Sequence, residues 1–174
     1  FIPRGESTVH SGIVRDDGVV AIETVAEVNN GASFEAILAS VMGTEKGDVS
    51  DRIEEGKLFE RSEVTLHAPI PSAGRLFCFG AVYTGHVSDA GLGLTFDPNQ
   101  WLIPDNAIIG PEDEIVLPDR VADNVKPAAE LCVVIGQAGK YIEPSDAYDH
   151  IAGYSISNDV TTRTEWPGPM AYKM

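Results

Sequence analysis

The chain has 174 residues, enough for one domain or for one domain with a small appendage. Hydrophobic residues make up 43% of it, which predicts a packed core, but no apolar run reaches the length of a bilayer crossing. Twenty-seven acidic residues against twelve basic ones give a net charge of −15, which argues against nucleic acid as a partner. Because the chain has no such apolar run, and no basic stretch precedes a short apolar one near its first residues, we expect a protein that is neither exported nor bound to a membrane.

The acidic residues are spread along the chain rather than gathered in a tail, and only five of the twelve basic residues are lysines. An acidic surface poor in lysine suits a salt-rich cytoplasm, because salt screens the repulsion between like charges. An ordinary acidic cytosolic enzyme has the same composition, so the sequence leaves both habitats open within an expected cytoplasmic location. The two cysteines, Cys78 and Cys132, each lie in an apolar run, which predicts buried, inert thiols.

A β-hairpin is predicted near the start of the chain. Two apolar runs, residues 12–15 and 19–22, flank Asp16-Asp17-Gly18, where the glycine can supply the positive φ that the turn needs. This hairpin would open a small N-terminal region, residues 1–70.

Helices and one more strand complete the expected N-terminal region. Helices are expected at residues 34–42 and at 49 to about 55, because each segment has helical spacing and is followed by a glycine. A strand is expected at residues 64–66. Pro69 and Pro71 then mark a boundary, after which residues 71–174 would form a second domain.

Short strands dominate the second region. The clearest apolar or β-branched runs are residues 76–79, 131–135 and 153–157. One short helix is expected to open at Pro144. Many short strands and few brief helices predict an α+β fold that is mainly β. A nucleotide-binding loop is not expected, because Gly91-Leu92-Gly93 lacks both the required spacing and a following helix.

Three stretches of the second region, in this order and spacing, resemble the fumarylacetoacetate hydrolase family: residues 75–89, 107–118 and 129–161. The first contains a strand, a glycine and the run from Tyr83 through His86 to Asp89. The third contains Glu130 at the start of an apolar strand and Asn158-Asp159 at the end of another. The resemblance implies a roll of layered mixed sheets, usually assembled as dimers, so we expect a homodimer.

The resemblance also implies a function. Members of this family use Mg²⁺, or a similar hard ion such as Mn²⁺ or Ca²⁺, on small 2-oxo acid or acylpyruvate-type (1,3-dicarbonyl) substrates. A divalent ion chelated by the substrate's carboxylate and keto oxygens stabilises an enolate as a Lewis acid. We therefore expect a metal-dependent hydrolase or lyase, acting by C–C bond hydrolysis, decarboxylation or isomerisation.

Site residues follow by position within the family's motifs. The metal ligands would be Glu130 and Asp159, oxygen donors of the kind that Mg²⁺ prefers. Position 128 is Ala where the family carries Glu, which removes one of three carboxylates. His86 falls on the catalytic histidine and Asp89 on its carboxylate partner. Their i, i+3 spacing on one helical face would let the carboxylate orient the imidazole.

Lys173 falls on an active-site lysine of the family, which would contact the substrate carboxylate or the oxyanion. In contrast, Ile103 and Thr164 stand where the family has Lys and Asp. These losses leave two hypotheses open: a divergent enzyme, or a catalytically impaired relative that serves as a binding or scaffold subunit. Family members continue with further strands past the position of Met174, so we expect the catalytic domain to be incomplete at its C-terminus.

Overall fold

The computed structural model describes residues 1–22, 36–37, 39–40, 46–70, 73–89, 91, 98–117, 119, 125–162 and 172–173. Short strands predominate, and the α-helices with described bounds are α2 (Lys46–Glu55) and α3 (Thr84–Asp89). Short 3-10 helices are η2 (Arg61–Glu63), η3 (Asp105–Ala107) and η5 (Pro144–His150). The predicted α+β, mainly β class is therefore confirmed. No helix among these residues is long and apolar enough to cross a membrane.

The N-terminal region is built on a three-stranded antiparallel sheet in the order β2-β3-β4. Its strands are β2 (Gly12–Arg15), β3 (Gly18–Ala21) and β4 (Leu58–Glu60). The predicted hairpin is confirmed, because β2 pairs with β3 in a register that sets Arg15 opposite Gly18. A separate two-stranded pair joins β1 (Ile2–Pro3) to β5 (Val64–Thr65), which brings the first residues beside the end of the region.

Most of the fully buried apolar side chains lie in this N-terminal region. One cluster is formed by Phe1, Val19, Ala21 and Val64, with Phe59 and Leu66 packed against it. Val20 and Ile22 form a second cluster, against which side chains including Val49 and Ile53 of α2 pack. All four residues of β3 are buried, so this strand is the centre of the N-terminal core.

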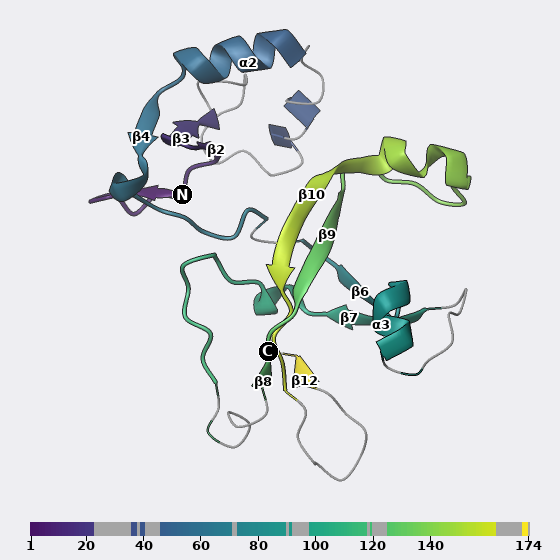
Figure 1. Ribbon diagram of the computed structural model, residues 1–174. Helices are drawn as coiled ribbons and strands as arrows, with labels where there is room; N and C mark the ends of the chain where they lie inside the picture. The colour runs from purple at the N-terminus through teal and green to yellow at the C-terminus, as the bar shows by residue number, and fades with distance from the viewer. Residues whose placement is uncertain are drawn as a thin grey trace.

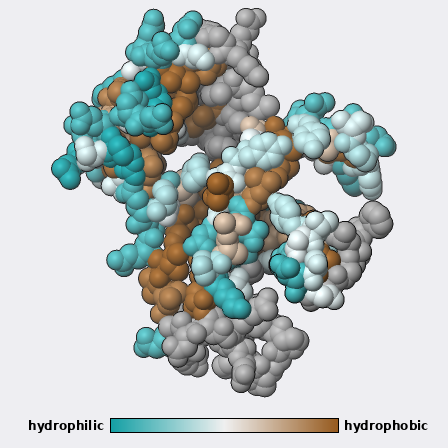
Figure 2. Space-filling view, in the orientation of Figure 1, coloured by the Kyte–Doolittle hydropathy of each residue, from teal (hydrophilic) through white to brown (hydrophobic). Residues whose placement is uncertain are grey.

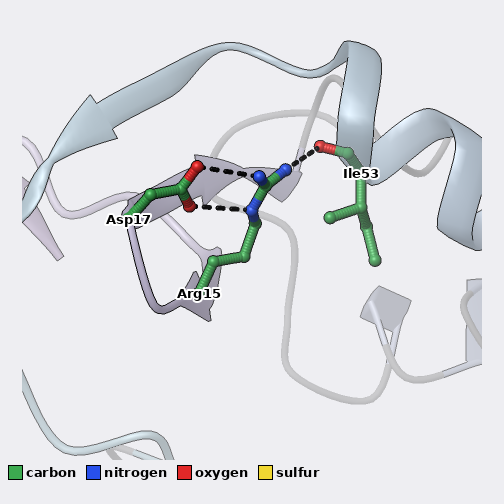
Figure 3. Close-up of polar contacts among 3 residues, drawn as sticks. All are labelled: Arg15, Asp17 and Ile53. Atoms are coloured by element: carbon green, nitrogen blue, oxygen red, sulfur yellow. Dashed lines mark hydrogen bonds and ion pairs between the residues drawn. The ribbon is translucent and has the colours of Figure 1, made fainter.

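Arg15 connects the hairpin turn to α2 (Figure 3). Its guanidinium donates to both carboxylate oxygens of Asp17, at 2.9 and 2.8 Å, and to the carbonyl oxygen of Ile53 at 3.2 Å. The last carbonyls of a helix lack intrahelical partners, and a cation there also complements the helix dipole. Arg15 therefore holds the turn and the C-terminal end of α2 together.

Three small antiparallel sheets make up the region from residue 75 onward. One pairs β6 (Leu76–Gly80) with β7 (Asn99–Ile103). The longest pairs β9 (Ala129–Ile135) with β10 (Ile151–Asn158) and crosses the middle of the molecule in Figure 1. The third has the order β12-β11-β8, formed by Tyr172–Lys173, Thr161–Thr162 and Val125–Lys126.

These sheets leave much apolar surface open. On one face of the β9–β10 pair, five large side chains are exposed: Leu131, Val133, Ile135, Tyr154 and Ile156. Figure 2 shows hydrophobic side chains reaching the surface along this hairpin. Phe77, Phe79 and Leu102 are similarly exposed on the β6–β7 pair. The chain has 12848 Å² of accessible surface, whereas a compact monomer of its mass exposes about 8,200 Å².

Contacts cross the predicted boundary near residue 70. Arg61, in η2, forms an ion pair with Glu112. The backbone of His67 and Ala68 lies so close to Gly110 that a Cβ built on this glycine would approach the Cα of His67 to 3.1 Å. The division into residues 1–70 and 71–174 stays a prediction, and the two parts are in direct contact here.

Several expected details are corrected by the structure. The second helix begins at Lys46, three residues before the expected position, and the strand expected at 64–66 ends at Thr65. The helix expected at 34–42 lies largely outside the described residues, although residues 36–37 and 39–40 are helical. The prediction that the thiols are buried was wrong, because Cys78 and Cys132 are only partly buried. Both cysteines lie in two-stranded sheets whose faces are only partly covered, so part of each thiol faces solvent.

Replacing Gly18 with Ala should destabilise the protein by about 1–3 kcal/mol. Gly18 has a φ of 155°, and a Cβ there would overlap the carbonyl oxygen of Phe59 on β4. Urea unfolding would measure the change in the free energy of unfolding. Gly153→Ala is the matched control, because a Cβ on this strand glycine meets nothing within 4 Å. Equal stability of the two variants would contradict the proposed overlap.

Candidate active site

The β9–β10 pair brings predicted site residues onto one face of the sheet. In its register, Glu130 is directly opposite Ser157 and Ala129 is opposite Asn158. Side chains of directly opposed residues share a face, and residues two apart on one strand share it too. Glu130, Cys132, Ser155 and Ser157 therefore lie on one face, which we call the ligand face. A contact between Cys132 Sγ and Ser157 Oγ at 3.2 Å agrees with this placement.

Asp159 extends the ligand face by one position. Its backbone N–H donates to the carbonyl oxygen of Ala128 at 2.8 Å, so the two residues are opposed just beyond the last ladder pair. Asp159 is two positions after Ser157 on the strand, which puts it diagonally across from Glu130. Diagonal neighbours in an antiparallel pair have Cα atoms roughly 7–8 Å apart and Cβ atoms somewhat closer. Two carboxylates at that spacing can reach a common ion.

Asn158 secures the end of this hairpin. Its side-chain oxygen Oδ1 accepts a hydrogen bond from the backbone N–H of Ala128 at 3.2 Å. The ordinary ladder stops here, since a side chain rather than a backbone carbonyl accepts this bond. Asn158 and Asp159 thus hold both backbone groups of Ala128, its N–H and its carbonyl oxygen. This is the position at which the sequence departs from the family's pattern.

The donor set fits a hard divalent ion only in part. Glu130 and Asp159 provide two carboxylates on the ligand face, and Ser157 adds a neutral hydroxyl oxygen between them. Ala128, opposite Asp159, contributes no donor. Within the described ranges of the chain, no group of three or more His, Cys, Asp or Glu side chains could together hold a metal ion. Hard cations bind oxygen ligands and complete their shell with water, so a two-carboxylate site remains compatible with Mg²⁺ or Mn²⁺.

Lys173 is brought into the same neighbourhood by backbone pairing. Strand β12 pairs with β11, and the register sets Lys173 opposite Thr161, which is itself opposite Lys126 of β8. Thr161 follows Asp159 by two residues. The strand pairing therefore places the backbone of residue 173 beside the chain segment that carries Asp159. A lysine that contacts the substrate near the metal ligands would need this proximity.

His86 and Asp89 both lie on α3, the short helix after β6. Both residues are exposed, and Val87 between them is 4% exposed and anchors the helix. No hydrogen bond or ion pair joins the two side chains in the part of the chain that the structure describes. The predicted orienting contact thus stays a prediction.

The turn between β6 and α3 contains a feature that sequence reasoning missed. Ala81 has a φ of 58°, in the left-handed region that glycine usually occupies. For an alanine this conformation costs roughly 1–2 kcal/mol. A glycine at this position would have signalled the turn. The strained turn directs the chain from β6 into the helix that carries His86.

A cavity of about 440 Å³ lies at the same end of the β9–β10 pair, bordered by Pro127, Ala129, Ile156, Ser157 and Asn158. The register puts Ala129, Ile156 and Asn158 on the face opposite the ligand face. Neither Glu130 nor Asp159 borders this cavity, which is thus not centred on the two carboxylates.

A family model agrees with the motifs on these elements. The model described as fumarylacetoacetate (FAA) hydrolase C-terminal matches residues 75–171, more than half of the chain. The chain belongs to the fumarylacetoacetate hydrolase family. The resemblance seen in the sequence is thereby confirmed. Its matched region contains β6, α3, β9 and β10, and so includes the ligand face and His86.

Individual relatives within this family are similar over the same part. The mitochondrial oxaloacetate tautomerase FAHD2A of Bos taurus is 38% identical over 106 residues, covering 61% of this chain and 33% of its own length. Protein Rv2993c of Mycobacterium tuberculosis is 39% identical over 110 residues, covering 63% of this chain and 41% of its own. The chain thus aligns with about a third to two fifths of these relatives.

Solved structures with similar coordinates support the fold. Maleylpyruvate hydrolase from Sphingobium sp. SYK-6, in complex with manganese (II) ion and pyruvate, superposes with a TM-score of 0.72 at 20% identity. That match covers 94% of this chain and 60% of the other. A putative HpcE protein from Mycobacterium smegmatis gives a TM-score of 0.67 at 24% identity, covering 91% and 56%. At such identities the likeness establishes the fold.

Replacing Asn158 with Ala should lower the free energy of unfolding by about 0.5–1.5 kcal/mol, because Ala128 N–H loses its acceptor. Urea unfolding followed by circular dichroism would measure this. The control is Asn99→Ala, at an exposed strand residue that makes no side-chain hydrogen bond within the described ranges. If both substitutions have the same effect, the Asn158 side chain does not secure the hairpin end.

Proposed function

We propose that this member of the fumarylacetoacetate hydrolase family is part of a metal-dependent enzyme for small 2-oxo acid or acylpyruvate-type substrates. The observation that carries the proposal is the shared face of Glu130 and Asp159, set by the β9–β10 register inside the region that matches the family. Relatives named as an oxaloacetate tautomerase and, by fold, a maleylpyruvate hydrolase support this substrate class. Both named substrates carry a 2-oxo acid unit.

Glu130 and Asp159 would hold a divalent ion such as Mg²⁺ or Mn²⁺. The maleylpyruvate hydrolase of the same fold was solved in complex with manganese and pyruvate, which supports the use of a divalent ion and a 2-oxo acid ligand by this fold. When bound, the ion supplies Lewis-acid stabilisation of negative charge on the substrate's keto oxygen. The missing carboxylate at position 128 leaves more of the coordination shell to water and substrate, so binding should be weaker than in a three-carboxylate site.

The remaining roles belong to side chains outside the ligand pair. His86 would move a proton to or from the substrate carbon or a water, and Asp89 would orient its imidazole. Lys173 would contact the substrate carboxylate or the developing oxyanion. These three assignments rest on the family's motif and on the strand pairing that sets position 173 near Asp159. They predict that His86→Asn would slow turnover more than it weakens metal binding.

Metal-stripped protein titrated with Mn²⁺ in a calorimeter should bind the ion, and oxalate should bind only when the ion is present. Oxalate mimics the planar enolate of a 2-oxo acid and chelates an ion through two oxygens. Glu130→Gln should weaken Mn²⁺ binding by about tenfold or more, because it removes one of two charged ligands. Even the loss of a residue that only hydrogen-bonds to a metal ligand typically reduces metal affinity by about tenfold. Glu143→Gln, at an exposed glutamate beside η5, is the control.

One outcome would count against the enzyme hypothesis, and another against the assignment of Glu130 as a metal ligand. Wild-type protein that is folded but binds neither ion nor oxalate would favour the catalytically impaired scaffold. Unchanged affinity in Glu130→Gln would place the ion elsewhere.

Ala128→Glu should increase Mn²⁺ affinity by about tenfold or more, since period-two alternation puts the new carboxylate on the ligand face opposite Asp159. The same variant should be less stable without metal, because three like charges then lie close together. Ala129→Glu adds the same charge one residue away on the other face and should leave affinity unchanged. Calorimetry and thermal unfolding with and without Mn²⁺ would check both effects, and equal behaviour of the two variants would refute the assigned face.

A further inference from the structure

On the ligand face, Cys132 has no role in the site described so far, and Ser157 has been considered only as a neutral oxygen between the two carboxylates. Cys132 and Ser157 lie diagonally across the β9–β10 pair, with Sγ and Oγ 3.2 Å apart. Ser155, not Ser157, is the residue directly opposite Cys132. The thiol therefore reaches past its direct partner toward the end of the hairpin at which Glu130 lies.

The contact with Cys132 still allows Ser157 to donate a hydrogen bond elsewhere. Its hydroxyl oxygen can accept from the thiol, and the serine O–H is then available for a second partner. Directly opposite Ser157 is Glu130. Directly opposed residues have Cβ atoms roughly 4.5–5.5 Å apart, and an ionised carboxylate is a strong acceptor. The described side chains of Ser157 and Glu130 are not hydrogen-bonded to each other, and a change of side-chain rotamer would complete a short chain of donors from Cys132 through Ser157 to Glu130.

We propose that Ser157 is a positioning residue of the metal site, held by Cys132 and donating its hydroxyl proton to the Glu130 carboxylate. The inference rests on the proposed function, since it assumes that Glu130 is a metal ligand. Ligating carboxylates are commonly oriented by hydrogen bonds from a second layer of residues, and losing such a partner typically reduces metal affinity by about 10–100-fold. With Ala at position 128, the site depends on two carboxylates, so the orientation of each one matters more.

The test is Mn²⁺ affinity, measured by calorimetry on the metal-stripped chain. Ser157→Ala should bind Mn²⁺ about tenfold more weakly, while Ser157→Thr, which keeps the hydroxyl, should restore affinity to within about threefold. Ser155→Ala is the matched control. It removes the same group from the same strand and face, but at a position opposite Cys132 instead of Glu130, and should change affinity by less than about twofold.

A second pair of variants tests the donor behind Ser157. Cys132→Val removes the thiol donor at similar volume and should weaken Mn²⁺ binding, whereas Cys132→Ser keeps a donor and should not. This pair decides the matter if Ser157→Ala fails to fold, which thermal unfolding would reveal.

The outcomes separate the two proposals. Wild-type binding that Ser157→Ala and Cys132→Val leave unchanged would overturn the positioning role and leave the proposed function standing. Absence of Mn²⁺ binding by the folded wild-type chain would overturn both. Equal losses in Ser157→Ala and Ser155→Ala would show a general packing effect and would also overturn the inference.

Discussion

The antiparallel register of β9 and β10 is the constraint on which the candidate site depends. Because side chains alternate between the two faces of a strand, a slip of one residue would move Glu130 from the ligand face to the apolar face. An irregularity between Ile151 and Gly153, where the pairing shifts by one residue, lies at the other end of this pair. Such bulges are specific features of a sheet that help to fix its register. The hydrogen bonds of Asn158 and Asp159 to Ala128 fix the near end.

Different interactions stabilise the N-terminal region and the region that contains the ligand face. The N-terminal region has the more complete core, with β3 buried along its whole length and Arg15 connecting the turn to α2. The region with the ligand face relies mainly on strand pairing, and many of its apolar side chains are exposed. Hydrogen bonds within a sheet define geometry well, but apolar burial supplies most of the free energy of folding. The site is therefore positioned by a ladder that has little core of its own among the described residues.

Local sequence signals predicted the local elements. The Gly18 turn follows from the positive φ that glycine tolerates, and the strands at β9 and β10 follow from dense β-branched and apolar runs. Glu130 and Asp159 could be named from motifs on those strands. Strand β7 was not predicted, because its first residues, Asn99 and Gln100, lack the composition of a strand and are paired by β6.

Features that depend on pairing between distant residues could not be derived from the sequence. Ser157 opposes Glu130 although it lies 27 positions further along the chain, and no local pattern encodes that partnership. The expected burial of Cys132 followed from its apolar neighbours, but Leu131 and Val133 lie on the opposite face of the strand and do not cover the thiol. Ala81 gives no sign of its left-handed conformation, since alanine rarely adopts it. Burial and cross-strand contacts are properties of the assembled sheet.

The open apolar face of the β9–β10 hairpin has a consequence for the behaviour of this chain in solution. Strands with unpaired edges and an exposed apolar face can add further strands from other molecules, which is the first step of aggregation. The net charge of −15 opposes such encounters between copies. Salt shortens the range of this repulsion to about 10 Å at 0.1 M and about 3 Å at 1 M. Colloidal stability of the isolated chain should therefore be greatest in dilute buffer, although a high-salt habitat would demand the opposite.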